Sequence, residues 1–171
     1  MTGEWQLALL NEEADGARVL ACAERASDYI LLETGRVPDA TWVQGVFNDI
    51  PPGRSKEDIL MFGVEQPDGR LSGLLGMAPG YETATEWYIG LLLITEAERG
   101  AGLGRGVLQS VKGLAKSAGA ETLKVAVLVK NPDAIRFWER EGFMPFRDAP
   151  DDGPDNGAGD GHDRVVLQLT L

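Results

Sequence analysis

The sequence predicts an α/β protein whose mixed, mostly antiparallel sheet has about seven strands and is flanked by about four helices. An apolar segment over 60–65 is followed by the turn Gln66-Pro67-Asp68-Gly69 and a second strand-like segment, which indicates an antiparallel hairpin. A further apolar strand, over 86–94, runs into a glycine-rich turn and an amphipathic helix. The 171 residues, 43% of them hydrophobic, suffice for a substantial core, and we expect a single domain over 1–171.

The N-terminal third predicts one strand and two helices. Residues 5–10 have the pattern of a short strand. The first helix begins at Asn11 or Asp15, both good capping residues, and extends toward Leu32. Its inner face consists of small and apolar residues at helical spacing: Val19, Cys22, Ala23, Ala26 and Ile30. A second helix is predicted over 39–48, where Trp42, Val43, Val46 and Phe47 share one stripe.

The remaining segments alternate between the strand and helix patterns. We expect strands over 70–77, 86–94, 122–130, 143–146 and 164–171, and helices over 102–117 and 132–141. The last two strands are predicted to form a closing hairpin. Between them, residues 149–163 are rich in Asp and Gly, but their spacing does not match a calcium-binding EF-hand and no Glu closes the segment. We therefore expect a solvated loop there.

The segment 91–106 predicts an anion-binding loop. An apolar strand ends at Ile94, and Arg99, Gly102 and Gly104 precede the amphipathic helix. Glycines at a strand-to-helix turn let a ligand approach the backbone closely. The start of a helix adds unpaired N–H donors and a partial positive charge. Together these features predict a socket for a phosphate or pyrophosphate, with Arg99 as an additional cation.

Two common phosphate-binding loops do not fit this segment. A P-loop requires Lys and then Ser or Thr after its last glycine, whereas Arg105-Gly106 follows Gly104 here. A dinucleotide-binding Rossmann loop requires a third glycine two residues further on and an acidic residue at the end of the next strand. That strand ends at Lys130, a cation.

The spacing Arg99-x-x-Gly102-x-Gly104 resembles the acyl-CoA pyrophosphate loop of the GNAT acyltransferases. A second segment, Asn131-Pro132-Asp133-Ala134-Ile135-Arg136-Phe137-Trp138-Glu139-Arg140-Glu141-Gly142-Phe143, resembles the later motif of the same family. The two motifs cover roughly the last half of the chain. The resemblance implies a GNAT fold with a V-shaped opening in the sheet. It also implies an N-acetyltransferase that moves an acetyl group from acetyl-CoA to a primary amine of a small molecule, in a ternary complex and without a metal.

The same resemblance implies which residues bind acetyl-CoA. The pyrophosphate would sit on the loop residues Arg99, Gly100, Ala101, Gly102, Leu103, Gly104 and Arg105. The pantetheine arm would run beside the preceding strand and bond the backbone at Leu92 and Ile94 like an added strand. A backbone N–H near Leu93 or Ile94 would polarise the thioester carbonyl. From the second motif, Asn131, Ala134, Phe137 and Trp138 would lie near the coenzyme, although Asn131 is equally well explained as a helix cap.

One position departs from the family pattern. Many members have a tyrosine as the second aromatic residue of the later motif, where it can protonate the departing thiolate, but this chain has Trp138. An indole N–H donates a hydrogen bond but does not deliver a proton. Either Tyr88 or Tyr29 substitutes, or the thiolate, with a pKa of roughly 8.5, leaves unprotonated.

The general base and the acceptor site are less well defined by the sequence. Glu86 is our first candidate for the base, because it begins the strand whose far end would hold the thioester. Glu65 and Glu33 are the second and third candidates. We expect the acceptor between the first two helices, the 77–86 loop and the acidic loop, which carry the residues Asp28, Tyr29, Glu33, Tyr81 and Glu82.

Composition excludes some partners. The net charge is −11 and the sequence pI about 4.5, which argues against nucleic acid. No apolar run approaches the length of a membrane span, and the N-terminus lacks a signal pattern, so we expect a cytoplasmic protein without a membrane partner. The single cysteine, Cys22, is predicted to be a buried apolar residue. A homodimer stays open.

Besides a nucleotide-binding α/β domain, two other functions remain open at this point. The first is a module that binds and senses acyl-CoA without catalysis, which the presence of Trp138 in place of tyrosine favours. The second is an acetyltransferase that modifies protein N-termini or lysines.

Overall fold

The computed structural model describes residues 4–51, 53–149 and 162–171. Its seven strands form one sheet in the order β1-β2-β3-β4-β5-β7-β6. All neighbouring strands are antiparallel except β4 and β5, which are parallel. The fold class predicted from the sequence is therefore confirmed. The strands are β1 (Gln6–Leu9), β2 (Leu60–Glu65), β3 (Leu71–Ala78), β4 (Glu86–Ile94), β5 (Thr122–Leu128), β6 (Met144–Ala149) and β7 (Arg164–Thr170).

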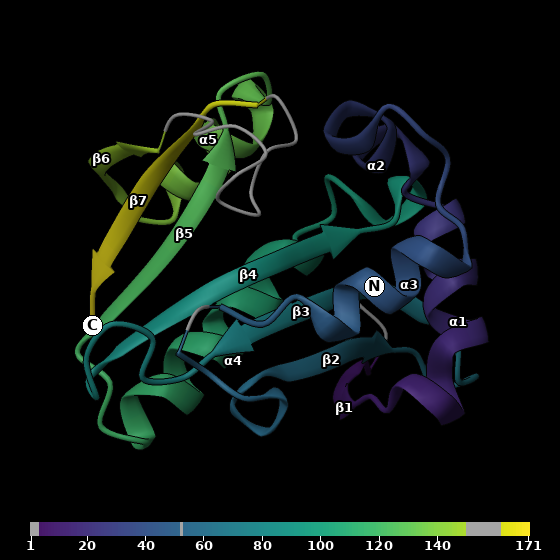
Figure 1. Ribbon diagram of the computed structural model, residues 1–171, viewed down its shortest axis with the longest axis horizontal. Coiled ribbons are helices and arrows are strands. Elements are labelled where there is room, and N and C mark those ends of the chain that lie inside the picture. Colours follow the sequence, from purple (N-terminus) through teal and green to yellow (C-terminus); the bar gives the residue numbers. More distant parts are fainter. Residues whose placement is uncertain (1–3, 52, 150–161) are drawn as a thin grey trace.

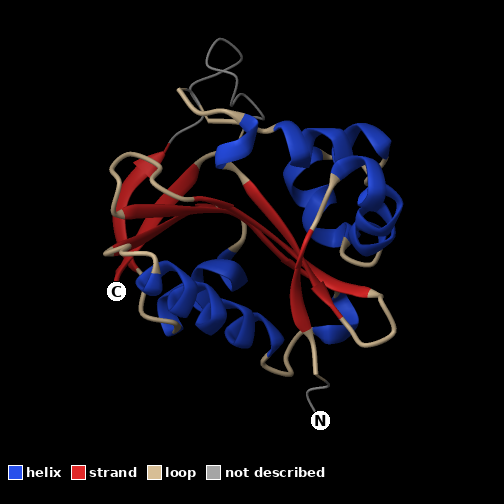
Figure 2. Cartoon of the chain, turned by 90° about the horizontal axis from the view of Figure 1, so that it is seen from below, coloured by secondary structure: helices blue, strands red, loops and turns tan. Residues whose placement is uncertain are grey.

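Within the described residues, five α-helices belong to this fold, and they cover the two faces of the sheet (Figures 1 and 2). They are α1 (Glu12–Glu24), α2 (Ser27–Thr34), α3 (Ala40–Asn48), α4 (Leu103–Ser117) and α5 (Pro132–Arg140), and two short 3-10 helices are η1 (Lys56–Asp58) and η2 (Glu96–Glu98). The helices α1, α2 and α3 gather on one face, and α4 lies on the other. Each face has its own apolar core, one around α1 and α3 and one around α4 and α5.

The single helix predicted from Asn11 toward Leu32 is in fact two helices, and this part of the prediction was wrong. The chain leaves helical geometry at Ala26, whose φ is −132° and ψ 30°. The carbonyl of Arg25 accepts a hydrogen bond from the Glu96 N–H (3.0 Å), and the Arg25 guanidinium donates to the Leu71 carbonyl (2.7 Å). These tertiary partners hold the break, and no Gly or Pro marks it in the sequence.

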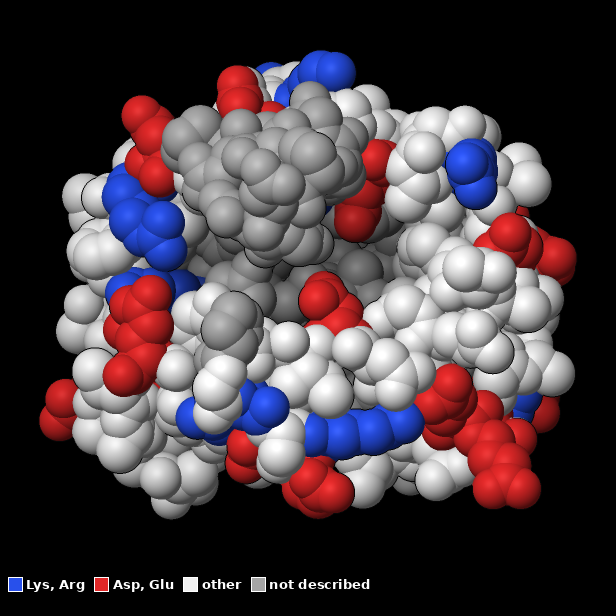
Figure 3. Space-filling view, in the orientation of Figure 1, with Lys and Arg blue, Asp and Glu red and all other residues white. Residues whose placement is uncertain are grey.

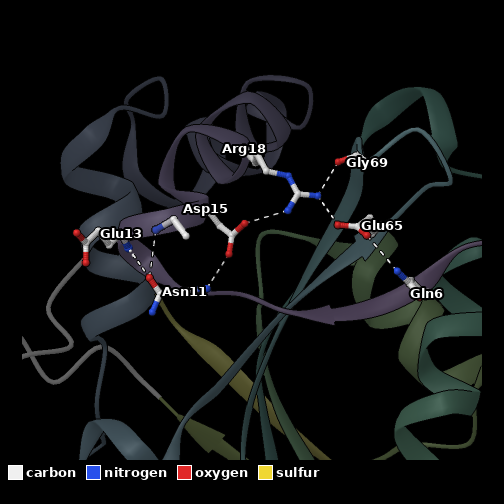
Figure 4. A network of polar contacts seen from close by, with 8 residues as sticks. Gln6, Asn11, Glu13, Asp15, Arg18, Glu65 and Gly69 are labelled. Atoms are coloured by element: carbon white, nitrogen blue, oxygen red, sulfur yellow. Dashed lines mark hydrogen bonds and ion pairs between the residues drawn. The ribbon is translucent and has the colours of Figure 1, made fainter.

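The N-terminus of α1 is tied to the β2–β3 hairpin by a polar network (Figure 4). Arg18 pairs with Asp15 (2.9 Å) and with Glu65, and it also donates to the Gly69 carbonyl at the turn (2.6 Å). The Arg18 hydrogen bond holds the pKa of Glu65 below its ordinary value. Gln6 of β1 donates to the same carboxylate (3.0 Å), so the network joins one helix to two strands.

The sheet opens between β4 and β5, as the V expected from the sequence resemblance. The two strands pair only from Glu86 with Thr122 to Ile89 with Val125. Beyond these pairs they diverge (Figure 1). At the same point the β3–β4 register shifts between Gly76 and Met77, which leaves Gly90 as an extra residue in β4. A β-bulge therefore marks the vertex of the V.

The acidic loop predicted over 149–163 lies almost entirely outside the described residues. Its flanking strands β6 and β7 pair antiparallel, as predicted for a closing hairpin, and β7 also pairs with β5. Within the described residues, no helix is long and apolar enough to cross a membrane.

Candidate functional site

The loop between β4 and α4 has the backbone geometry of an anion site. Gly100 and Gly102 have positive φ angles of 78° and 86°, and among the described residues nothing lies within 4 Å of where either glycine would carry a side chain. Gly102 caps α4, and the Gly106 N–H is bonded to the Gly102 carbonyl (3.0 Å). Leu103 and Gly104 lie in this first turn, where helix geometry provides no hydrogen-bond acceptor within α4 for their N–H groups.

Gly104 has a different role from the two loop glycines. A side chain there would point at the Phe137 ring, 3.5 Å away, and at Ile94, 3.7 Å away, which are ordinary contacts. A methyl group at position 104 would therefore fit between α4, α5 and the end of β4, so packing does not require a glycine there. Phe137, which the sequence placed near the coenzyme, lies beside this loop.

The Arg99 guanidinium points at α2. Its Nη1 and Nη2 atoms bind the two oxygens of Asp28, at 2.5 and 3.0 Å, and its Nε donates to the Ile94 carbonyl at 2.8 Å. The Arg99 hydrogen bond is the main reason that the pKa of Asp28 lies below its ordinary value. Asp28, predicted as part of the acceptor wall, is thus bound to Arg99, at the start of the glycine-rich loop between β4 and α4.

The edge of β4 that faces the V presents specific backbone groups. The Thr95 N–H donates to the Ser72 carbonyl of β3 (3.0 Å), and partners alternate along an antiparallel pair. This alternation directs the Leu93 N–H to β3 and the N–H groups of Leu92 and Ile94 into the V. The two positions expected to bond pantetheine therefore face the opening, whereas Leu93 does not.

The residues of the second motif have different structural roles: Asn131 caps a helix, and Trp138 belongs to the core. Asn131 caps α5 by accepting from the Ala134 N–H at 3.2 Å. Trp138 is only 5% exposed and packs edge-on against Phe137 and Phe143, with ring centroids 5.2 and 4.9 Å apart. Core packing accounts for Trp138, which the sequence resemblance placed near the coenzyme.

Tyr88 lies on β4 two residues before the bulge, beside the vertex of the V. Its ring stacks on Tyr81, with centroids 4.7 Å apart. Burial raises the pKa of Tyr88 to about 12, although the backbone of Ala126, on β5 just past the last β4–β5 pair, lowers it in part. The hydroxyl group therefore stays protonated near neutral pH.

Glu86 forms a buried ion pair that the sequence did not indicate. Its Oε2 lies 3.0 Å from Nζ of Lys124, and the two side chains are 11% and 7% exposed. Glu82 is a second partner of Lys124 at 3.3 Å, and the Phe146 ring lies 4.2 Å from its ammonium group. Burial opposes the charged form, but the bonds to Glu86 and Glu82 outweigh it and raise the pKa of Lys124. Oε1 of Glu86 is buried and has no hydrogen-bond partner among the described residues.

The other candidate carboxylates differ in position. Glu65 is bound by Arg18 and Gln6 at the β2–β3 hairpin (Figure 4). Glu33 of α2 faces Tyr29: burial chiefly, and then the Glu33 carboxylate, raises the pKa of Tyr29, which also senses Tyr88 and Arg164. Glu33, Glu86 and Tyr88 lie on the side of the sheet that α1–α3 cover. Glu65, which binds Arg18 of α1, lies on the same side but on β2, two strands away from β4.

Figure 3, drawn from the α1–α3 side, shows a hollow in the middle of this face with acidic side chains around it. A separate groove of about 650 Å³ lies at the β1–β2 end of the sheet, between the start of α1 and the end of α3. Its lining includes Leu9, Phe47 and Met61 and none of the residues of the V.

Comparisons with known proteins agree with this arrangement. The sequence model described as "Acetyltransferase (GNAT) family" matches residues 30–143. A search of curated protein sequences finds no significant match. An acetyltransferase from Thermus thermophilus is similar in structure, with a TM-score of 0.74 and 23% identity over 98% of this chain and 97% of that one. Ard1 from Thermoplasma volcanium has a TM-score of 0.66 and 16% identity over 98% and 97%. Nourseothricin acetyltransferase has a TM-score of 0.57 and 23% identity over 66% and 65%.

Proposed function

Since the chain belongs to the acetyltransferase (GNAT) family, we propose that it transfers the acetyl group of acetyl-CoA to a primary amine of a small molecule. The observation that carries the proposal is the combination of an open β4 edge with an amide-lined loop at its end. Leu92 and Ile94 direct N–H groups into the V, and the unpaired amides of Leu103 and Gly104 follow. We expect the reaction to take place in the cytoplasm.

The coenzyme would lie along this edge. Its pyrophosphate would accept hydrogen bonds from the amides over 100–105, where the α4 N-terminus adds a partial positive charge. Its pantetheine arm would bond the free edge of β4 at Ile94. The thioester carbonyl would then reach the Leu92 N–H, the first amide past the bulge that faces the V, which would stabilise the developing negative charge.

In the transfer step, the neutral amine attacks the thioester carbon. The C–N bond forms, the C–S bond breaks, and the amine proton must leave. Oε1 of Glu86 is a proton acceptor without a partner in the described structure, and it would take the amine proton through a water molecule. This assigns Glu86 the role of base.

Tyr88 would assist the departing sulfur as a hydrogen-bond donor. A phenol with a pKa of about 12 does not readily give its proton to a thiolate whose conjugate acid has a pKa of roughly 8.5. We therefore assign Tyr88 a hydrogen bond to the sulfur, and the thiolate leaves as the anion. Because Tyr88 would provide the hydrogen bond to the sulfur, no acid is needed at position 138, where Trp138 packs in the core.

The acceptor site favours a small cationic compound. The carboxylates of Glu33 and Glu86 and the stacked rings of Tyr81 and Tyr88 belong to the same side of the sheet, an environment that binds ammonium groups. The buried Trp138 favours a second candidate, a protein that binds acyl-CoA without transferring the acyl group.

A single assay separates these functions. Acetyl-CoA is incubated with a panel of small amines and with peptides that offer a free N-terminus or lysine, and released thiol is measured with a colorimetric reagent. Cys22 is fully buried and burial raises the pKa of its thiol to about 11, so the folded protein adds little background. Thiol release and an acetylated small amine by mass spectrometry are expected. Tight binding without thiol release on any amine would favour the sensor, and turnover of peptides alone would contradict a small-molecule acceptor.

Two variants test the assigned roles. Glu86→Gln should lower turnover by about 10²- to 10⁴-fold, the usual contribution of a general base. Glu24→Gln, which changes an exposed carboxylate at the end of α1, is the matched control and should keep full activity. Equal turnover by Glu86→Gln and Glu24→Gln would refute the assignment.

A further inference from the structure

We propose that Asp28 is a positioning residue that couples binding of the coenzyme to the placement of α2 on the acceptor side of the site. The inference rests on the proposed function. Asp28 is the second residue of α2, and it is followed at once by Tyr29, whose neighbours include Glu33, Tyr88 and Arg164. The helix that carries part of the acceptor wall is thus bound to a residue of the coenzyme loop.

The ion pair between Arg99 and Asp28 has a defined geometry. Arg99 presents two nitrogens to the two oxygens of Asp28, a bidentate arrangement that fixes both distance and angle. Its third donor, Nε, is bonded to the Ile94 carbonyl at the end of β4. Three of its donors are therefore used, and the guanidinium acts as a strut between β4, the loop and α2. The sequence predicted Arg99 as an additional cation for the pyrophosphate, and the structure adds this contact with Asp28.

Among the described residues, α2 packs against the core of its face through Ile30, its one buried residue, and through the partly buried Tyr29, whereas Leu31 and Leu32 are exposed. Its N-cap, Ala26, makes no side-chain capping bond. The second link to the loop is the hydrogen bond from the Glu96 N–H to the Arg25 carbonyl, just before α2 begins. Both links connect α2 to the segment between β4 and the coenzyme loop.

This geometry sets the sign of the coupling. Gly100 and Gly102, which follow Arg99, have positive φ angles. Because glycine restricts the backbone less than other residues do, this loop has conformational freedom to lose when a ligand binds. A pyrophosphate bound on the loop amides would restrict that freedom and hold the Arg99 backbone still. The Asp28 contact then costs less entropy, and α2 becomes better ordered. By thermodynamic reciprocity, an acceptor that orders α2 would tighten coenzyme binding.

Hydrogen exchange with coenzyme A as the probe tests this coupling without any acceptor. In the wild-type protein, saturating coenzyme A should slow exchange of the amides over 29–34 by roughly two- to five-fold, the factor that an exposed ion pair can supply. In Asp28→Asn this slowing should disappear. Asp28→Glu, which keeps the carboxylate, should restore part of it. Glu24→Gln removes a nearby exposed charge that lies outside the Asp28–Arg99 pair and should behave as wild type.

The outcomes separate the two proposals. Coenzyme A binding with unchanged or faster exchange in α2 of the wild-type protein would overturn the role of Asp28 and leave the proposed function intact. Equal slowing in wild type and Asp28→Asn would overturn it as well. No binding of coenzyme A to the wild-type protein would overturn both. If Asp28→Asn does not fold, Arg99→Lys, which keeps the charge but loses the bidentate geometry, is expected to show the same loss of slowing.

Discussion

Replacing Lys124 by Met should destabilise the protein far more than replacing Glu86 by Gln, although the two side chains form one ion pair. The Lys124 ammonium has three neighbours: Glu86 at 3.0 Å, Glu82 at 3.3 Å and the Phe146 ring at 4.2 Å. The Glu86 carboxylate has only Lys124 on one oxygen and, within the described residues, no hydrogen-bond partner on the other. The two substitutions therefore leave very different groups behind.

The expected magnitudes follow from what each variant leaves buried. Lys124→Met leaves a carboxylate with no partner, and stranding one member of a buried pair costs about 3–5 kcal/mol. In a chain of this size Tm falls by roughly 2–4 °C for each kcal/mol, so we expect a loss of roughly 6–20 °C. Glu86→Gln keeps an amide oxygen near Lys124 and leaves Glu82 in place, so its cost should be about 1–2 kcal/mol.

Urea unfolding at neutral pH, followed by fluorescence of the tryptophans, measures both losses on one scale. The slope of the unfolding free energy against urea should match that of the wild type, because neither change alters the surface exposed on unfolding. The exposed variant Glu24→Gln should unfold with the wild type. Equal losses in the two variants, or wild-type stability in Lys124→Met, would refute the description of this pair as buried and asymmetric.

Three further perturbations have defined outcomes. The pKa of Tyr88 is about 12 in the folded protein and about 10 when unfolded. The stability that depends on its protonated form is therefore complete below pH ~10 and is lost as the pH rises toward 12. In urea unfolding at a series of pH values, Tyr88→Phe should lose less stability over that range than the wild type. Gly102→Ala should cost about 1–2 kcal/mol through its left-handed backbone and weaken acetyl-CoA binding in calorimetry, whereas Gly104→Ala should keep the fold, since its new methyl group would meet Phe137 at 3.5 Å. Equal effects at the two glycines would count against the loop geometry. Cys22 should resist thiol reagents until the protein unfolds, so labelling as fast as that of a free thiol would show that α1 is not packed as described.

Much of the fold was predictable because local signals agreed with tertiary structure. The turn at 66–69 and the hydrophobic runs beside it predicted the β2–β3 hairpin, and β2 and β4 have the predicted bounds. Asn11 caps the first helix, as its side chain suggested. At these places the residues that favour a turn, a strand or a cap lie within a few positions of the element they form, so the sequence alone indicates it.

What could not be predicted depends on partners distant in sequence. The break before α2 is held by Glu96 and Leu71, which lie far along the chain from Arg25. Lys124 has the pattern of an ordinary strand residue, and only the register of β4 with β5 places it beside Glu86. The bidentate contact between Asp28 and Arg99 spans 71 positions. Motif spacing located the loop but carried no information on where the Arg99 side chain points.

The most direct test of coenzyme binding along the open edge of β4 is the backbone amide spectrum of the protein titrated with acetyl-CoA. We predict that the resonances of Leu103 and Gly104 shift downfield on saturation, together with those of Leu92 and Ile94, because these N–H groups acquire hydrogen bonds to the coenzyme. If acetyl-CoA saturates the protein while these four amides keep their positions and others move, then the coenzyme does not lie along this edge.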